Sequence, residues 1–155
     1  MKKLLLIALA NLGLITQNFA ETASNTQEVT ITIQSLDTLT ISNAISITAR
    51  AGESVNNTES TYTLQMNGSV SSTRTIAVST ASTIPANVTL KLYVPNPSNG
   101  TAQPGVTLSN IAQDLVTGID PNFDSTGTLQ YNLAPEDNAT PITDAKITVT
   151  FTVTT

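Results

Sequence analysis

The sequence predicts an all-β protein, a single immunoglobulin-like antiparallel β-sandwich of about eight or nine short strands. Apolar and polar residues alternate over most of the chain, and the strand-favouring residues Thr, Val, Ile and Leu are abundant. Turn-forming residues separate the alternating runs at regular intervals. The 155 residues fit one domain, and 39% hydrophobic against 11% charged residues favours a folded core over disorder.

Residues 1–20 are predicted to be a cleaved secretory signal peptide. Lys2 and Lys3 precede a short apolar run over residues 4–15, and Ala20 closes a sequence that resembles a signal-peptidase site. The apolar run is too short to span a bilayer as a mature helix. We therefore expect a domain over residues 21–155 that is exported through the periplasm to the cell surface or the medium, without direct membrane insertion after cleavage.

Behind a polar leader, residues 21–28, the first strand is predicted at residues 29–33 (VTITI), where Val and Ile alternate with Thr. Apolar residues at odd-numbered positions resume over residues 39–47. Asn43 and Ala44 interrupt this second run, and we expect a β-bulge or a tight bend at that point.

A third short strand is predicted over residues 62–66, where apolar residues again occupy every second position. It ends at Asn67-Gly68, a dipeptide typical of two-residue hairpin turns. We therefore expect a hairpin whose second strand lies within residues 70–78.

The clearest central strand is predicted over residues 88–94, where Val and Leu occupy every even-numbered position. It should end at residues 95–100, because proline cannot donate a hydrogen bond to a ladder. Residues 111–116 (IAQDLV) have helical spacing, so we expect a single helical turn or a crossover loop there. The last two strands are predicted over residues 129–133 and 147–153.

The chain contains no His, no Cys and no Trp. It therefore has no His general base, no Cys nucleophile, no zinc site built from His and Cys, and no disulfide. A Ser nucleophile would have only Lys91 or Lys146 as a base, and neither follows an S-x-x-K pattern. We expect a protein that is not an enzyme and uses no cofactor.

Removal of residues 1–20 leaves 135 residues with four basic and eleven acidic side chains, hence a net charge of −7. An acidic surface without a basic cluster disfavours nucleic acid as a partner, since phosphate binding needs Lys and Arg.

Two acidic segments are candidate sites. Asp120, Asn122 and Asp124 have the D-x-N-x-D spacing of a calcium loop, but the sixth and twelfth positions lack the expected Gly and Glu. An ordinary polar turn is the main interpretation there, and a calcium site is the alternative. A glycosidase-like enzyme that uses Glu136 or Asp124 is a further hypothesis, although sugar-binding aromatic platforms are missing.

The two predicted terminal strands give a further indication of function. Residues 29–33 and residues 145–154 (AKITVTFTVT) are regular, alternating and almost uncharged. They either pair within one sandwich, or the N-terminal strand is added to a neighbouring subunit, with its alternate side chains entering pockets. Exposed strands of this kind must be covered, because bare edges aggregate.

A signal peptide, a VTITI strand near the mature N-terminus and a C-terminal ITVTFTVT strand together resemble bacterial fimbrial subunits, in particular the Cys-free major pilins of chaperone–usher systems. Exported domains related to spore-coat protein U share the same type of closing strand. The resemblance implies a donor strand within residues 21–35, carried by Val29, Ile31 and Ile33. It also implies that one edge of the acceptor groove is formed by Ile147, Val149, Phe151 and Val153. The expected partners are a periplasmic chaperone and an outer-membrane usher.

The first functional hypothesis is therefore a non-catalytic exported structural subunit, a pilin or fimbrial protein that forms a homo-polymer on the cell surface by β-strand donation. The alternative is a monomeric secreted or surface adhesion module, which would bind its ligand through loops such as residues 95–105 and 118–127.

Overall fold

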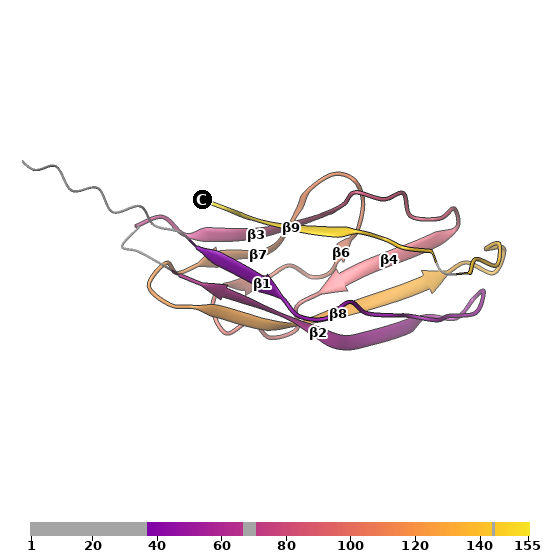
Figure 1. Cartoon of the computed structure of the whole chain (residues 1–155), viewed down its shortest axis with the longest axis horizontal. Coiled ribbons are helices and arrows are strands. Elements are labelled where there is room, and N and C mark those ends of the chain that lie inside the picture. The colour runs from indigo at the N-terminus through magenta and orange to yellow at the C-terminus, as the bar shows by residue number, and fades with distance from the viewer. Residues whose placement is uncertain (1–36, 67–70, 144) are drawn as a thin grey trace, which may run out of the picture. The chain divides into compact units, whose positions relative to one another are not determined.

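The computed structural model describes residues 37–66, 71–143 and 145–155, all of which belong to the compact unit Ile33–Thr155. These residues contain nine strands in two stacked sheets (Figure 1). The strands are β1 (Thr38–Ile41), β2 (Val55–Gln65), β3 (Arg74–Thr80), β4 (Val88–Tyr93), β5 (Thr101–Ala102), β6 (Val106–Thr107), β7 (Gln113–Ile119), β8 (Ser125–Pro135) and β9 (Val149–Thr154). Among the described residues, no helix is long and apolar enough to cross a membrane.

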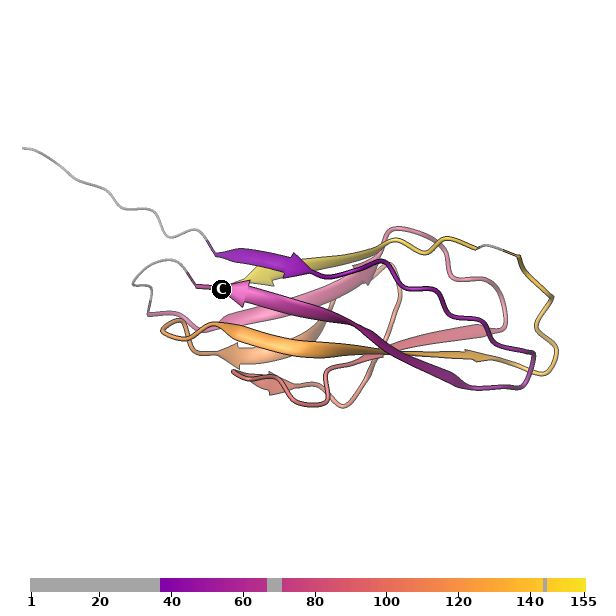
Figure 2. The ribbon, with the colours of Figure 1, turned by 60° about the horizontal axis from the view of Figure 1, so that its bottom comes forward.

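The first sheet has the strand order β1-β2-β8-β4-β6 and the second has the order β5-β7-β3-β9. Every strand pair in both sheets is antiparallel. The predicted all-β antiparallel sandwich is therefore confirmed. Strands β1 and β9 are edge strands of different sheets, and they lie on the same side of the sandwich (Figure 1 and Figure 2).

The core lies between the two sheets, and the alternation of side chains along each strand determines which residues it contains. Even-numbered residues of β3 and β4 point inward, whereas their odd-numbered neighbours face outward, apart from the small Ala77. The largest fully buried apolar side chains come from both sheets: Tyr62, Leu64, Ile76, Val78, Leu92, Leu115, Val116, Ile119 and Leu129. Each fully buried aliphatic side chain contributes about 1.5–3 kcal/mol relative to exposure, so this shared layer is the main stabilising element.

The predicted strand at residues 88–94 is confirmed as β4, with Leu90, Leu92 and Val94 buried. Tyr93 faces outward, as the alternation requires, yet it is partly covered. Gly105 explains this cover, because a Cβ at that residue would lie 2.3 Å from the Tyr93 ring. Gly105 also has a φ of +99°, a backbone conformation that other residues rarely adopt.

The hairpin prediction at Asn67-Gly68 is wrong. The two residues lie outside the described part of the chain, but the strands on either side of them belong to different sheets. Strand β2 pairs with β1 and β8, and β3 pairs with β7 and β9. The segment therefore connects the two layers of the sandwich, a tertiary arrangement that a local turn signal does not encode.

The prediction of a helical turn or a crossover loop over residues 111–116 is also wrong, because β7 begins at Gln113 and includes the rest of this segment. Leu115 and Val116 are both fully buried although they are adjacent. A register shift in the β3–β7 ladder accompanies this break in the alternation, between Ile76 and Ala77 of β3. Two adjacent buried side chains interrupt the period of two, so the local sequence pattern does not indicate a strand.

Strand β1 ends at Ile41, and Asn43 has a φ of +39°, which agrees with the bend expected at that position. Strand β2 starts at Val55 rather than at Tyr62. Its first half is polar, and a register shift lies between Asn57 and Ser60. Ser60 is buried there and donates a 2.8 Å hydrogen bond to the carbonyl of Ser42.

The two ends of the sandwich carry different connections. At one end lie Asp37, the β7–β8 loop over residues 120–124 and the C-terminal Thr155; we call this the Asp37 end. At the other lie the β1–β2, β3–β4 and β8–β9 connections, joined by bonds such as that from Gly52 N to the Pro135 carbonyl, 3.1 Å; we call this the Gly52 end. Strand β9 runs from the Gly52 end to the Asp37 end, whereas β1 and β3 run from the Asp37 end.

The pKa values of two core tyrosines are raised by burial. Burial raises the pKa of Tyr131 from its ordinary value of 10.0 to about 12. Burial also raises the pKa of Tyr62, while the 3.0 Å hydrogen bond between its hydroxyl and Ser125 Oγ acts in the opposite direction. Both phenols are therefore held in the neutral form in the folded protein.

We expect the free energy of unfolding to be insensitive to these tyrosines below about pH 10 and to fall as the pH rises towards about 12. In the unfolded chain each phenol ionises near pH 10, whereas the folded protein keeps Tyr131 protonated up to about pH 12. The decline should not exceed about 1.4 kcal/mol per pH unit for each tyrosine. Urea unfolding across this range measures it. The Tyr131→Phe variant should show a shallower decline, and an unchanged decline would contradict the assignment.

Candidate functional site

Within the described residues, β9 pairs with β3 on one side and with no strand on the other. Its even-numbered threonines are exposed, whereas its odd-numbered apolar residues are partly buried against the core. These are the residues that the sequence predicted for an acceptor edge: Ile147, Val149, Phe151 and Val153. They keep part of their apolar surface uncovered, unlike Ile76 and Val78 of the neighbouring β3.

The first sheet presents a similar row at the same side of the sandwich. Leu39 and Ile41 of β1, followed by Ile45 and Ile47, are partly buried and pack against the same core. We call this side of the sandwich, with both apolar rows, the open edge. It consists of Leu39, Ile41, Ile45, Ile47, Ile147, Val149, Phe151 and Val153.

The open edge is suited to pairing with an additional β-strand. An edge strand presents unpaired backbone N–H and C=O groups, and proteins usually protect such a strand with Lys, Pro or a bulge. Strand β9 (VTFTVT) contains no charged residue and no proline. Its six-residue ladder with β3 is regular, without a register shift. A strand added beside β9 would form backbone hydrogen bonds with β9 and would also cover its apolar row.

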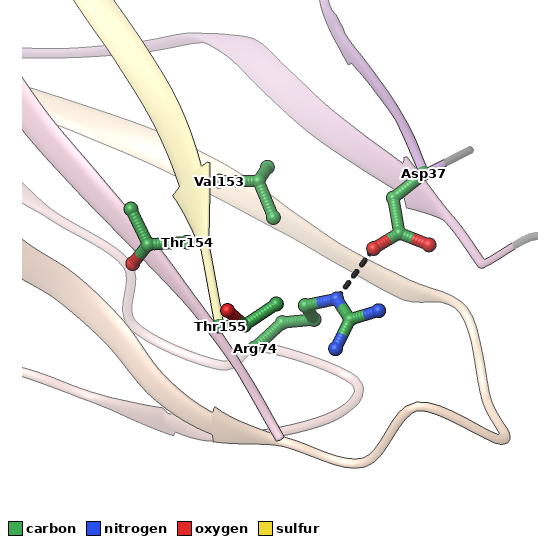
Figure 3. Close-up of a pocket in the computed structure, with 5 residues that line it drawn as sticks. All are labelled: Asp37, Arg74, Val153, Thr154 and Thr155. Carbon is green, nitrogen blue, oxygen red and sulfur yellow. Dashed lines mark hydrogen bonds and ion pairs between the residues drawn. The ribbon is translucent and has the colours of Figure 1, made fainter. Parts of the chain in front are cut away.

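An ion pair marks the Asp37 end of the open edge (Figure 3). Arg74 Nε lies 2.5 Å from Asp37 Oδ2, with only 4% of the Arg74 and 14% of the Asp37 side chain exposed. Arg74 Nη1 also donates a 2.7 Å hydrogen bond to the carbonyl of Ser72. A pocket of about 270 Å³ lies here, lined by Asp37, Arg74, Val153, Thr154 and Thr155.

This ion pair joins the two sheets. Asp37 immediately precedes β1 of the first sheet, and Arg74 begins β3 of the second. The pair therefore fixes Asp37, the first residue that the structure describes, next to the C-terminal end of β9. No motif in the sequence indicated this ion pair, although Arg74 has the same parity as the buried Ile76 and Val78, which is consistent with an inward side chain.

The predicted donor residues Val29, Ile31 and Ile33 lie outside the described residues. The first residue that the structure describes is Asp37, which follows Ile33 by four residues.

No family model, curated protein or solved structure matches this chain. The function must therefore follow from the residues and geometry of the chain itself.

The acidic side chains of the candidate calcium loop accept hydrogen bonds from other groups of the protein. Asp120 Oδ1 accepts hydrogen bonds from the backbone N and the side-chain Nδ2 of Asn122, at 2.9 and 2.8 Å. Asp124 Oδ1 instead accepts a 2.8 Å bond from Met66 N, at the end of β2. Among the described residues, no group of three or more acidic side chains is arranged to hold a metal ion. The contacts are those of a polar turn that attaches the β7–β8 loop to β2.

Asp124 and Glu136, which the glycosidase hypothesis names as alternatives, lie far apart. Asp124 precedes β8 at the Asp37 end, and Glu136 follows β8 at the Gly52 end. The 11 residues of β8 separate them by more than about 30 Å of extended strand. Paired glycosidase carboxylates lie within about 10 Å of each other. Asp124 and Glu136 therefore cannot act on one sugar linkage within a single subunit.

The loops considered for an adhesion module lie side by side at the Asp37 end. Asn99 Nδ2 donates to the carbonyls of Asp120 and Phe123, at 3.0 and 2.7 Å, and Asn99 Oδ1 accepts a bond from Asp120 N at 3.1 Å. Ser98 N donates to the Thr126 carbonyl at 2.8 Å. This bonding leaves Phe123 strongly exposed, a feature that the sequence pattern did not indicate.

Proposed function

We propose that this chain is a non-catalytic exported structural subunit, a pilin-like protein that polymerises on the cell surface when residues 29–33 of one copy add to the open edge of the next. The observation that supports this most directly is the uncharged outer side of β9, which pairs with no other strand of the described residues and carries a row of half-covered apolar side chains. Before assembly such an edge needs a cover, which is the role that the resemblance to pilins gives to a periplasmic chaperone.

The position of Asp37 favours donation of residues 29–33 to a neighbouring subunit over pairing of these residues with β9 of their own domain. The N-terminal segment joins the sandwich at the end where β9 finishes. To reach β9 of its own domain it would have to reverse over residues 34–36 and run parallel to β9. Those residues are Gln-Ser-Leu, without the Gly or Asn that short reversals commonly need. A neighbour's segment has no such constraint and can run antiparallel, the slightly more stable pairing.

An antiparallel strand has one register that suits both its apolar side chains and the pocket. With Ile31 opposite Phe151, Val29 lies opposite Val153 and Ile33 opposite Val149. All three donor side chains then face the apolar row of β9, and Val29 reaches the pocket at the Asp37 end. Burying three aliphatic side chains supplies roughly 5–9 kcal/mol before the strand's ordering is subtracted.

The first test is an unboiled surface extract run on a denaturing gel and probed with an antibody against the mature chain. A ladder at multiples of one subunit that collapses to one band on boiling would support kinetically stable strand donation. A lone monomer band without boiling would contradict it and would favour the monomeric adhesion module.

The register predicts a specific cross-link. Thr30 and Thr152 would be directly opposite each other on the outer face, and opposed strand residues have Cα separations within disulfide range. Because the chain has no Cys, the double variant Thr30→Cys/Thr152→Cys should form disulfides only between subunits. After mild oxidation we expect a ladder that survives boiling and collapses on reduction.

The matched control is Thr32→Cys/Thr152→Cys, which carries the same two thiols two residues out of register. It should give no such ladder. Fold-back of a segment parallel to β9 would instead bring Thr30 or Thr32 close to Thr152 of the same chain, and one of the two variants would then form an intramolecular disulfide, seen as a monomer with altered mobility. That result would contradict donation to a neighbour.

A further inference from the structure

In the described part of the chain, the large apolar side chains that are strongly exposed lie at the ends of the sandwich. Phe123, at the Asp37 end, is 66% exposed. Ile142, in the β8–β9 connection at the Gly52 end, is 49% exposed. Ile111 is 70% exposed and lies just before β7, towards the Gly52 end and two strands from β9 in the order of its sheet.

Phe123 is held by a bonded loop. Its N–H donates to the Asp120 carbonyl at 3.3 Å, and its own carbonyl accepts the 2.7 Å bond from Asn99 Nδ2. The next residue, Asp124, accepts the bond from Met66 N. The backbone on both sides of the ring is therefore fixed while the ring faces solvent. A pre-ordered aromatic side chain loses little entropy when a partner covers it, which is typical of interface anchors.

Phe123 also lies close to the point where the N-terminal segment joins the sandwich. Met66 follows Gln65, the residue that pairs with Thr38 at the start of β1. The loop that carries Phe123 is thus one strand away from Asp37.

Strand donation determines which ends meet, so this inference rests on the proposed function. A donor segment antiparallel to β9 leaves the accepting subunit at its Gly52 end. Only residues 34–36 then separate Ile33 from Asp37 of the donor, and four residue steps span at most about 14 Å. The Asp37 end of one copy is therefore held against the Gly52 end of the next, beside Ile147, which is five residues from Ile142.

We propose that Phe123 of one copy packs against Ile142 of the next copy, as a second contact between subunits outside the donated strand. The partner is a second copy of this chain, and the contact is head-to-tail. It covers one exposed apolar side chain on each end, and it limits the angle between successive subunits in the polymer.

Disulfide trapping tests this contact, again because the native chain has no Cys. Polymers of Phe123→Cys/Ile142→Cys, mildly oxidised and then boiled without reductant, should give a ladder of covalent multimers. The matched control is Phe123→Cys/Ile111→Cys, in which the second thiol lies just before β7, two strands from β9 in the order β5-β7-β3-β9. It should give no ladder beyond background, and an equal ladder in both variants would overturn the proposal.

The unboiled, unoxidised gel separates this proposal from strand donation. If that gel shows a ladder and oxidation of Phe123→Cys/Ile142→Cys yields monomers alone, the end contact is wrong while donation stands. If Phe123→Cys alone yields covalent dimers, two Asp37 ends meet and the head-to-tail contact is wrong. If the unmodified chain gives no unboiled ladder, donation fails and the contact fails with it.

Discussion

Replacing Ile31 by Asp should abolish the polymer ladder while the subunit still folds. The central donor side chain would have to bring a carboxylate against Phe151, and burial of an unpaired charge costs more than the aliphatic contact supplies. The core residues of the described domain begin at Leu39, so the sandwich itself keeps its packing. The measurement is the unboiled gel, combined with circular dichroism and urea unfolding of the purified subunit.

The matched control for this change is Thr32→Asp, which places the same charge on the neighbouring outward position and should keep the ladder. A mixture gives a stricter test. An Ile31→Asp subunit can accept a strand but cannot donate one, so small amounts added to unmodified subunits should shorten the polymers. Normal assembly of Ile31→Asp subunits would rule out donation by residues 29–33.

Replacing Asp37 by Ala should lower the free energy of unfolding by about 3 kcal/mol, because it leaves the Arg74 guanidinium buried without its carboxylate. The Arg74 side chain is only 4% exposed and cannot recover full hydration in the fold. A loss of this size is a large fraction of the stability of a typical domain. Urea or guanidinium unfolding of the purified subunit measures it.

The double variant Asp37→Ala/Arg74→Met is the control. It removes the charge together with its partner and fills the same space with an apolar side chain, so it should recover most of the loss. If Asp37→Ala alone is as stable as the unmodified protein, the ion pair does not fix the start of β1.

The sequence predicted those parts of the fold in which one face of a strand is buried. In β4 the inward positions are all Val or Leu, and in β9 they are Val and Phe with Thr between them, so local alternation is sufficient. It failed in β7, where Leu115 and Val116 are adjacent and both buried. It also failed at Asn67-Gly68, since the choice between a hairpin and a crossing to the other sheet depends on partners distant in the sequence.

The candidate site was predictable only in part. The apolar row on β9 follows from alternation, and the structure places it at an outer edge with no second partner among the described strands. That Asp37 would meet Arg74 beside the end of β9 depends on how the two sheets stack, which no local pattern specifies. The exposure of Phe123 likewise depends on hydrogen bonds between two loops that are separated in the sequence.

The Asp37–Arg74 ion pair has a mechanical consequence. In a polymer joined through N-terminal segments, tension would enter each subunit at Asp37. The first bonds to bear it are those between β1 and β2, which span four residue pairs and lie across the strand axis. A pull along β1 loads these bonds together in shear, rather than opening them one after another. Because Arg74 ties the same point to β3, the second sheet takes up part of the force, and the open side of the sandwich is braced where the load arrives.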